Sequence, residues 1–131
     1  MKPAGSCLQL DVGNSSAKWR LLRGDAVVGR GRYVPGDHVA RQALLESTQA
    51  LDCIWISSVA SAQVETELSQ LVESRWGVQP WFARTPARSG DLVNSYADPS
   101  RMGVDRWLAM LGAWQRQPGR LCVVDAGSAL T

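Results

Sequence analysis

The sequence is poor in histidine and cysteine, the side chains that most often bind zinc. It has one histidine, His38, and three cysteines in 131 residues, with no C-x-x-C pair. Zinc sites need clustered Cys and His ligands, so the composition argues against a zinc centre. The formal net charge of +2 is too small to indicate binding to nucleic acid or to a membrane surface. The composition therefore favours neither a zinc protein nor a nucleic-acid or membrane partner.

Long hydrophobic runs are missing too. Asp11 interrupts the first apolar run too early for a secretory signal, and no stretch approaches the roughly 20 apolar residues of a membrane span. The cysteines, Cys7, Cys53 and Cys122, lie far apart in apolar runs, which is typical of free thiols in a reducing compartment. We therefore expect a cytoplasmic globular protein.

Hydrophobic periodicity and turn residues predict a mixed α/β fold. Residues 7–12, 17–23 and 26–34 read as three antiparallel strands joined by Gly-containing turns. Strands then alternate with helices, which indicates a mixed sheet with helices packed on it. The expected later strands are 53–59, 78–83 and 120–126; the expected helices are 39–49, 61–77 and 101–117, with a loop over 84–100.

Helix-spaced apolar residues predict which sides of the helices face the core. In the first helix they are Val39, Ala43 and Leu44, with Leu51 beyond it. In the last helix the set is Val104, Trp107, Leu108, Leu111 and Trp114. Asp37 and Ser61 are expected to cap helices, and Gly77 to end one.

Two apolar strands each end in Asp-x-Gly followed by small hydroxyl residues: "LDVGNSSAKW" (10–19) and "VVDAGSALT" (123–131). In such a turn the strand delivers a carboxylate to its end, and the glycine lets the backbone turn sharply. The Asn and Ser residues that follow supply donors that can grip phosphate oxygens. Neither a P-loop nor a dinucleotide-binding glycine motif is present. Two such turns together suggest a clamp for a phosphate chain and a cation.

These segments resemble a known superfamily. "DVGNSSAKW" and "DAGSALT" are similar to the first and second phosphate motifs of the acetate and sugar kinase/Hsp70/actin superfamily. "NSYADPSRMGVDRWLAM" resembles the segment that distinguishes type III pantothenate kinases, and the likeness covers nearly the whole chain. It implies a ribonuclease H-like mixed sheet, the first domain of an actin-like two-domain kinase. Because family members are about twice as long, we expect residues 1–131 to be that domain, ending within or just before the second phosphate hairpin, without the second domain.

The resemblance also implies an activity and a site. The activity is ATP-dependent phosphorylation of pantothenate to 4'-phosphopantothenate, the first step of coenzyme A biosynthesis, by a homodimer that uses Mg²⁺ and a monovalent cation (K⁺ or NH₄⁺). Asp105 is the implied general base, and Asp11 and Asp125 are the implied metal ligands. The implied phosphate-binding residues are Asp11, Val12, Gly13, Asn14, Ser15, Ser16, Ala17, Lys18 and Ser128. The implied pantothenate-binding residues are Tyr96, Gly103, Val104, Asp105 and Arg106.

Two of these positions depart from the family pattern. Ser128 stands where the family usually has Thr, but the hydroxyl is kept. Val104 stands where Ala is common, and we expect it to pack on the sheet.

Simpler roles remain open for several of these residues. Lys18 can be a solvated strand residue, Asp105 can pair with Arg101 four residues earlier on one helix face, and Tyr96 can cover a sheet edge. At the level of the protein, the alternatives are a non-catalytic regulatory or accessory member of the family and another actin-like phosphotransferase. We also expect the 131 residues alone to bind ATP weakly and to turn over little.

Overall fold

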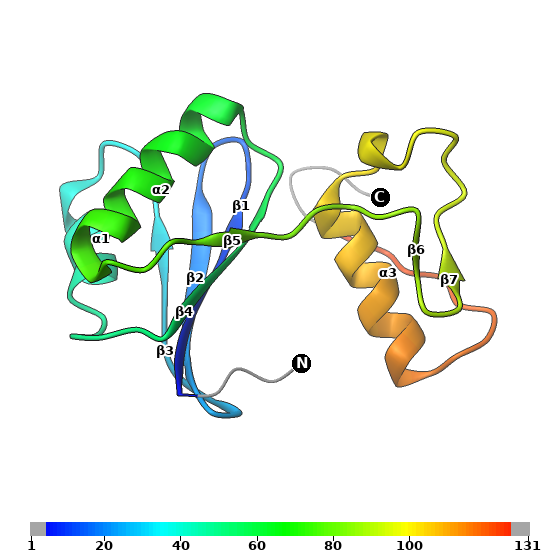
Figure 1. The fold of residues 1–131 in the computed structure, drawn as a ribbon, viewed down its shortest axis with the longest axis horizontal. Coiled ribbons are helices and arrows are strands. Elements are labelled where there is room, and N and C mark those ends of the chain that lie inside the picture. The colour runs from blue at the N-terminus through cyan, green and yellow to red at the C-terminus, as the bar shows by residue number, and fades with distance from the viewer. Residues whose placement is uncertain (1–4, 127–131) are drawn as a thin grey trace. The chain divides into compact units, whose positions relative to one another are not determined.

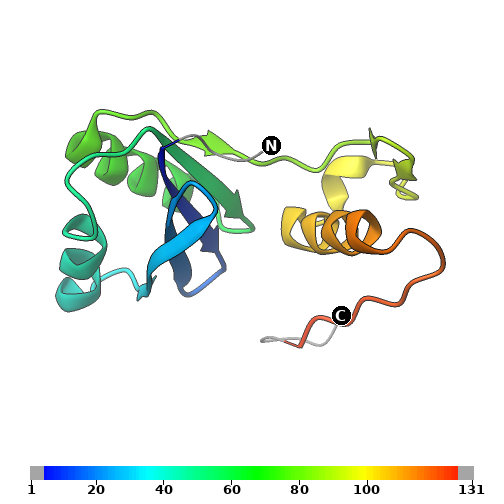
Figure 2. The same ribbon diagram turned by 90° about the horizontal axis from the view of Figure 1, so that it is seen from below.

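A computed structural model describes residues 5–126 of the chain. These residues form two compact units, which divide between Ala83 and Arg84 (Figures 1 and 2). None of the helices in the described range combines the length and the hydropathy of a membrane span.

The first unit contains a mixed sheet and two helices. Its elements are β1 (Ser6–Val12), β2 (Ala17–Arg23), β3 (Ala26–Tyr33), α1 (His38–Leu45), β4 (Cys53–Ser58), α2 (Ala62–Trp76) and β5 (Trp81–Phe82). The strand order is β3-β2-β1-β4-β5. β1, β2 and β3 pair antiparallel as a meander, whereas β4 and β5 join the sheet in parallel. The predicted mixed α/β class and the opening three-strand meander are confirmed.

One face of the sheet is apolar, and α1 and α2 pack against it (Figures 1 and 2). Because side chains alternate along a strand, the register places Leu10 of β1 between Trp19 of β2 and Ile56 of β4 on this face. A fully buried side chain of this size contributes about 1.5–3 kcal/mol. The core comprises Leu8, Leu10, Val12, Ala17, Trp19, Leu21, Leu44, Leu51, Ile54, Ile56, Leu68 and Val72.

The helix ends follow the capping residues that the sequence indicated. Asp37 Oδ1 accepts a hydrogen bond from the backbone N–H of Ala40, and Ser61 Oγ accepts one from Val64. Gly77 ends α2 at a φ of 66°, which glycine adopts without strain. In contrast, α1 ends at Leu45, not at residue 49, and the predicted core residue Val39 is 80% exposed. With its two turns, α1 buries only Leu44.

The second unit is held by a small core at the start of its long helix. Its elements are β6 (Arg88–Ser89), β7 (Leu92–Val93), the 3-10 helix η1 (Pro99–Arg101) and α3 (Val104–Arg116). Met102, Val104 and Trp107 are buried, as predicted for the last two. Leu108, also predicted to face the core, is exposed. The predicted loop over 84–100 contains a short antiparallel hairpin, β6–β7, and the start of η1.

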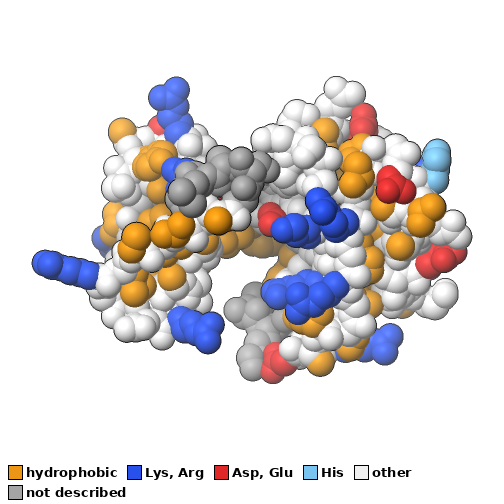
Figure 3. Space-filling view, turned by 180° about the vertical axis from the view of Figure 1, so that it is seen from behind, with side chains coloured by type: hydrophobic (Ala, Val, Ile, Leu, Met, Phe, Trp, Pro, Cys, Tyr) orange, Lys and Arg blue, Asp and Glu red, His pale blue; other side chains and the backbone are white. Residues whose placement is uncertain are grey.

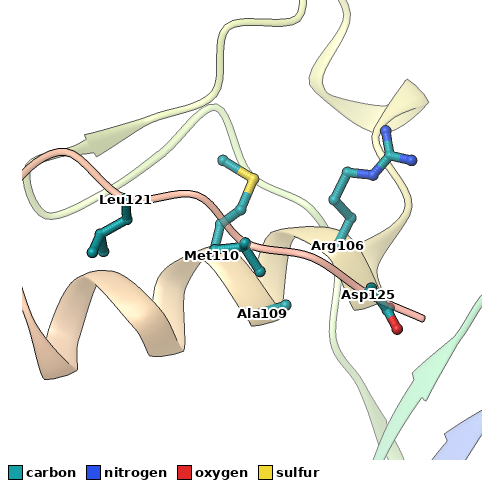
Figure 4. Close-up of a pocket in the computed structure, with 6 residues that line it drawn as sticks. Arg106, Ala109, Met110, Leu121 and Asp125 are labelled. Carbon is teal, nitrogen blue, oxygen red and sulfur yellow. The ribbon is translucent and has the colours of Figure 1, made fainter. Parts of the chain in front are cut away.

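The strand predicted over residues 120–126 does not form. Residues 121–125 have no regular secondary structure, and within the described range Ala126 makes only an isolated bridge. Propensity alone cannot hold a strand, because its backbone groups need a neighbouring strand. The segment instead runs beside α3, where both line one groove (Figure 4).

Candidate functional site

A tight turn links β1 and β2 at the first Asp-x-Gly motif. The backbone N–H of Gly13 donates to the carbonyl of Ser16 at 2.9 Å, which leaves Asn14 and Ser15 exposed at the tip. A Cβ at position 13 would lie 3.3 Å from the Ser16 carbonyl oxygen, so the turn is closed tightly at the glycine. The backbone and side-chain donors of the tip are therefore accessible to an anion.

Charged and hydroxyl side chains form a row across the sheet beside this turn. The register pairs Asp11 with Ser57 of β4 on one side and with Lys18 of β2 on the other, and Lys18 with Arg32 of β3. Paired residues of neighbouring strands share a face, so the row lies opposite the helices. Ser57 Oγ donates to Asp11 Oδ1 at 3.4 Å, and Arg32 Nη2 donates to Ser16 Oγ at 3.4 Å. One carboxylate and two cations thus lie next to the turn.

A small cavity lies on the other side of the same turn. It has a volume of about 50 Å³, and the turn forms one wall. The rest is formed by Tyr33 at the end of β3, by Pro35 after that strand, and by Val64, Glu67 and Leu68 of α2. Trp19 packs nearby over Gly31, and its buried indole N–H has no hydrogen-bond partner within the described structure. Helix α2 and the end of β3 therefore lie close to the turn on the side of the sheet that carries the helices.

The Gly-x-Asp-Arg run forms the first turn of α3. Gly103 is the N-cap residue and Val104 begins the helix with its side chain buried. Asp105 is exposed, and its Oδ1 accepts a hydrogen bond from the backbone N–H of Arg106 at 2.8 Å. The partial positive charge of a helix N-terminus favours a carboxylate at this place. The carboxylate is therefore held in the solvent-facing first turn.

The structure does not support the helical ion pair considered for Asp105. Arg101 is the last residue of η1, and the extended Met102 separates it from α3. The two side chains therefore do not lie on one helix face, and no ion pair joins them within the described residues.

Tyr96 and Arg106 contact one another. Arg106 Nη1 donates to the phenol oxygen of Tyr96 at 3.0 Å, and Tyr96 is 37% exposed. Because that oxygen accepts from the guanidinium, the hydroxyl hydrogen is left to donate elsewhere. The guanidinium and the phenol together offer donors to a carboxylate.

A groove of about 240 Å³ lies between α3 and the segment after it (Figure 4). Its walls are Ala109, Met110, Leu121 and Val123, with Arg106 and Asp125 at one end. Figure 4 shows the Arg106 guanidinium directed away from the Asp125 carboxylate. An apolar groove with a cation and a carboxylate at one end suits a small molecule that is both apolar and charged.

The candidate residues fall into both units. Asp11 and the 13–16 turn belong to the first unit, whereas Tyr96, the 103–106 run and Asp125 belong to the second. Convergence of Asp11, Asp105 and Asp125 around one phosphate remains a prediction. No three metal-binding side chains cluster among residues 5–126. Ser128 lies outside the described residues.

Three residues near the candidate sites did not stand out in the sequence. Ser57 reaches Asp11, and Arg32 reaches Ser16 of the 13–16 turn, only because strand pairing brings together residues that are far apart in the chain. Asn94 precedes Tyr96 by two residues inside the quoted motif, and only the structure identifies it as a buried polar residue. For Asn94 the available signal was an Asn within a loop, which is common turn chemistry.

Comparisons with known proteins match the sequence of this chain to a family. The family model for type III pantothenate kinase matches residues 7–131. The chain is 37% identical over 124 residues to a type III pantothenate kinase of Hahella chejuensis, which covers 95% of this chain and 50% of that protein. It is 35% identical over 128 residues to one of Thiobacillus denitrificans, covering 98% of this chain and 51% of that protein. It is 38% identical over 125 residues to a type III pantothenate kinase of Pseudomonas putida, and the match covers 93% of this chain and 50% of that protein. The chain spans about half the length of these relatives.

Proposed function

Because the chain belongs to the type III pantothenate kinase family, we propose that it is part of an enzyme that transfers a phosphoryl group from ATP to pantothenate. The product is 4'-phosphopantothenate, and the reaction is the first step of coenzyme A biosynthesis. The observation that carries this proposal is the start of α3. There the Gly-x-Asp-Arg run exposes Asp105 and joins Arg106 to Tyr96.

The second unit supplies the pantothenate site in this proposal. Arg106 and Tyr96 donate hydrogen bonds to the pantothenate carboxylate, which suits the bidentate geometry of a guanidinium. The groove beside α3, lined by Ala109, Met110 and Leu121, offers apolar contact to the rest of the molecule. Gly103 and Val104 set the backbone at the mouth of the site, since they form the N-cap and first residue of the helix.

Asp105 is the general base in this proposal. Its carboxylate accepts the proton of the pantothenate primary hydroxyl as the oxygen attacks the γ-phosphorus of ATP. The new O–P bond forms while the bond from the γ-phosphorus to the ADP oxygen breaks, so that ADP leaves. A base in hydrogen-bond reach accelerates such a step by about 10²–10⁴-fold.

The first unit supplies the ATP phosphate site. The exposed tip of the 13–16 turn offers backbone and side-chain donors, and Lys18 and Arg32 add positive charge beside it. Phosphoryl transfer needs such positioning and charge neutralisation more than covalent chemistry. Ser128, from the second Asp-x-Gly motif, completes the set by resemblance.

Two cations belong to the proposal. Asp11 is suited to Mg²⁺, which binds proteins through one or two carboxylates and otherwise keeps water and substrate phosphates as ligands. When bound, Mg²⁺ neutralises charge on the ATP phosphates. Asp125 would hold K⁺ or NH₄⁺. The carboxylates of Asp11 and Asp125 are both exposed at the ends of their segments, which fits hard cations.

The same proposal includes the architecture of the enzyme. The sheet order β3-β2-β1-β4-β5, antiparallel and then parallel, supports a ribonuclease H-like first domain of an actin-like two-domain kinase. A homodimer is also part of the proposal. Exposed apolar residues of the second unit that do not line the groove support it: Val93, Leu108 and Val124. Hydrophobic side chains gather on the face of this unit seen at the left of Figure 3.

The proposal is tested by measuring ADP release with and without pantothenate. We would compare the 131-residue chain with a protein that spans the full length of its relatives. The longer protein should release ADP only when pantothenate is present, whereas the 131 residues alone should bind ATP weakly and release little. A longer protein without pantothenate-dependent ADP release would refute the function. Robust turnover by the 131 residues would refute the need for a second domain.

A further inference from the structure

We infer that Asn94 is a positioning residue of the pantothenate site, which holds Tyr96 and, through it, Arg106 in the geometry that receives the substrate carboxylate. This inference rests on the proposed function. It adds a residue whose role neither the motif nor the relatives' names indicate.

Asn94 makes several hydrogen bonds that connect the segment between β7 and α3 to other backbone of the second unit. It is 7% exposed, and Asn94 is one of only two buried polar residues in the described range. Its Nδ2 donates to the carbonyls of Pro86 at 3.3 Å and Pro99 at 3.4 Å. Its backbone N–H donates to the carbonyl of Ala87 at 2.8 Å. The side chain thus ties together backbone that comes before β6 and backbone that begins η1.

The remaining atom of the Asn94 amide holds Tyr96. Oδ1 accepts the backbone N–H of Tyr96 at 3.0 Å, so the amide uses its donor and its acceptor at once. These partners also fix which end of the amide is oxygen, because two carbonyls face one end and an N–H faces the other. The phenol of Tyr96 then accepts from Arg106 at 3.0 Å. Tyr96 is therefore fixed at its backbone by Asn94 and at its hydroxyl by α3.

No other common side chain reproduces this pattern at position 94. An Asp would keep the acceptor for Tyr96 but would turn a carboxylate oxygen toward two carbonyl oxygens. An Ala would leave the Tyr96 N–H and two carbonyls without this partner in a partly buried place, and a polar group that loses its hydrogen bond there destabilises the loop. The loop that carries Tyr96 would then relax, and Tyr96 would leave the guanidinium.

The test uses the full-length protein and four variants. Asn94→Ala removes the amide that bonds to Pro86, Pro99 and Tyr96, and Tyr96→Phe removes the hydroxyl that Arg106 contacts. The double variant completes a cycle. Thr85→Val is the matched control, because Thr85 Oγ1 donates to the Met102 carbonyl at 2.8 Å in the same unit and, among the described residues, does not hydrogen-bond to Tyr96. For each, we would measure the KM for pantothenate, the KM for ATP, kcat and the thermal midpoint.

A positioning role predicts a specific pattern of kinetic constants. Asn94→Ala should raise the KM for pantothenate about tenfold, which corresponds to about 1.4 kcal/mol, while kcat and the KM for ATP stay within about twofold. The reason is that contacts to the carboxylate hold the substrate equally in the ground and transition states. Thr85→Val should lower the thermal midpoint without this KM change. In the Tyr96→Phe background, Asn94→Ala should add little.

Three outcomes separate the possibilities. If Asn94→Ala and Thr85→Val lower the midpoint alike and neither changes the KM for pantothenate, Asn94 is a structural residue only and the inference is wrong. If the effects of Asn94→Ala and Tyr96→Phe simply add, Asn94 does not act through Tyr96. If the unmodified full-length protein does not phosphorylate pantothenate, the proposed function fails, and this inference with it.

Discussion

The replacement Asp105→Asn tests the chemistry most directly. Asn has nearly the same size as Asp, and its side-chain oxygen can still accept the backbone N–H of Arg106, which is 2.8 Å away in the structure. The side chain is exposed, so no buried packing is lost. The change therefore removes the proton acceptor and leaves its position almost unaltered.

The size of the effect follows from these contacts. Loss of a general base lowers kcat by about 10²–10⁴-fold, or about 2.7–5.4 kcal/mol of activation free energy. The cost in stability is much smaller. A carboxylate in the first turn of a helix contributes about 0.3–1 kcal/mol through the helix dipole, so the free energy of unfolding should fall by no more than that.

The assay is pantothenate-dependent ADP release by the full-length protein, with thermal unfolding measured in parallel. Asp91→Asn is the matched control: Asp91 is also exposed and belongs to the same unit, in the turn between β6 and β7. The control should keep its kcat. A kcat for Asp105→Asn within about threefold of the unmodified protein would remove Asp105 from the role of base. A collapse of the thermal midpoint would show that the carboxylate holds the fold instead.

Three further predictions concern the first unit and the cysteines. Arg32→Ala should raise the KM for ATP about three- to tenfold, because it removes a cation from the 13–16 turn. Arg30→Ala on the same strand should leave that KM unchanged. Gly31→Ala should lower the free energy of unfolding in urea by about 1–3 kcal/mol, since the new Cβ would lie 2.4 Å from the indole ring that covers it; an unchanged midpoint would contradict this packing. A thiol reagent at pH 8 should label exposed Cys122 and spare Cys7 in the folded protein, as peptide mass spectrometry would show. Burial raises the pKa of Cys7 from its ordinary value of 9.0 to about 12, so the stability that the neutral thiol contributes is complete below pH 9 and is lost between about pH 9 and 12.

Local patterns predicted most of the first unit. The alternation in residues 17–23 and the turn residues around Gly24 are set by neighbours in the chain, and β2 begins and ends where the alternation does. The caps at Asp37 and Ser61 were readable for the same reason, since a cap involves residues within three positions. The sequence was less informative about which helical side chains are buried, because burial depends on how the helix packs. Val39 has helical spacing but is 80% exposed, and the two-turn α1 buries only Leu44.

The candidate site shows the same division. The Asp-x-Gly and Gly-x-Asp-Arg motifs are contiguous, so the sequence alone predicted Asp11, Asp105 and Arg106 as candidate site residues, and Tyr96 lies in the same quoted segment as the second motif. It did not reveal that Asn94 is buried, because burial depends on backbone brought together from residues 86 to 99. It also predicted a strand over 120–126 from β-branched residues. Residues 120–126 do not form a strand, because strand propensity has an effect only where a neighbouring strand pairs with the segment.

The order of residues by itself determined the family, the turn that follows Asp11 and the helix whose first turn carries Asp105, because each is encoded within a few consecutive positions. Only the tertiary structure decided that Arg32 contacts the 13–16 turn and that Tyr96 is held between Asn94 and Arg106. The physical reason is that hydrogen bonds and strand pairs act over a few ångströms in space, whatever the separation of their residues along the chain.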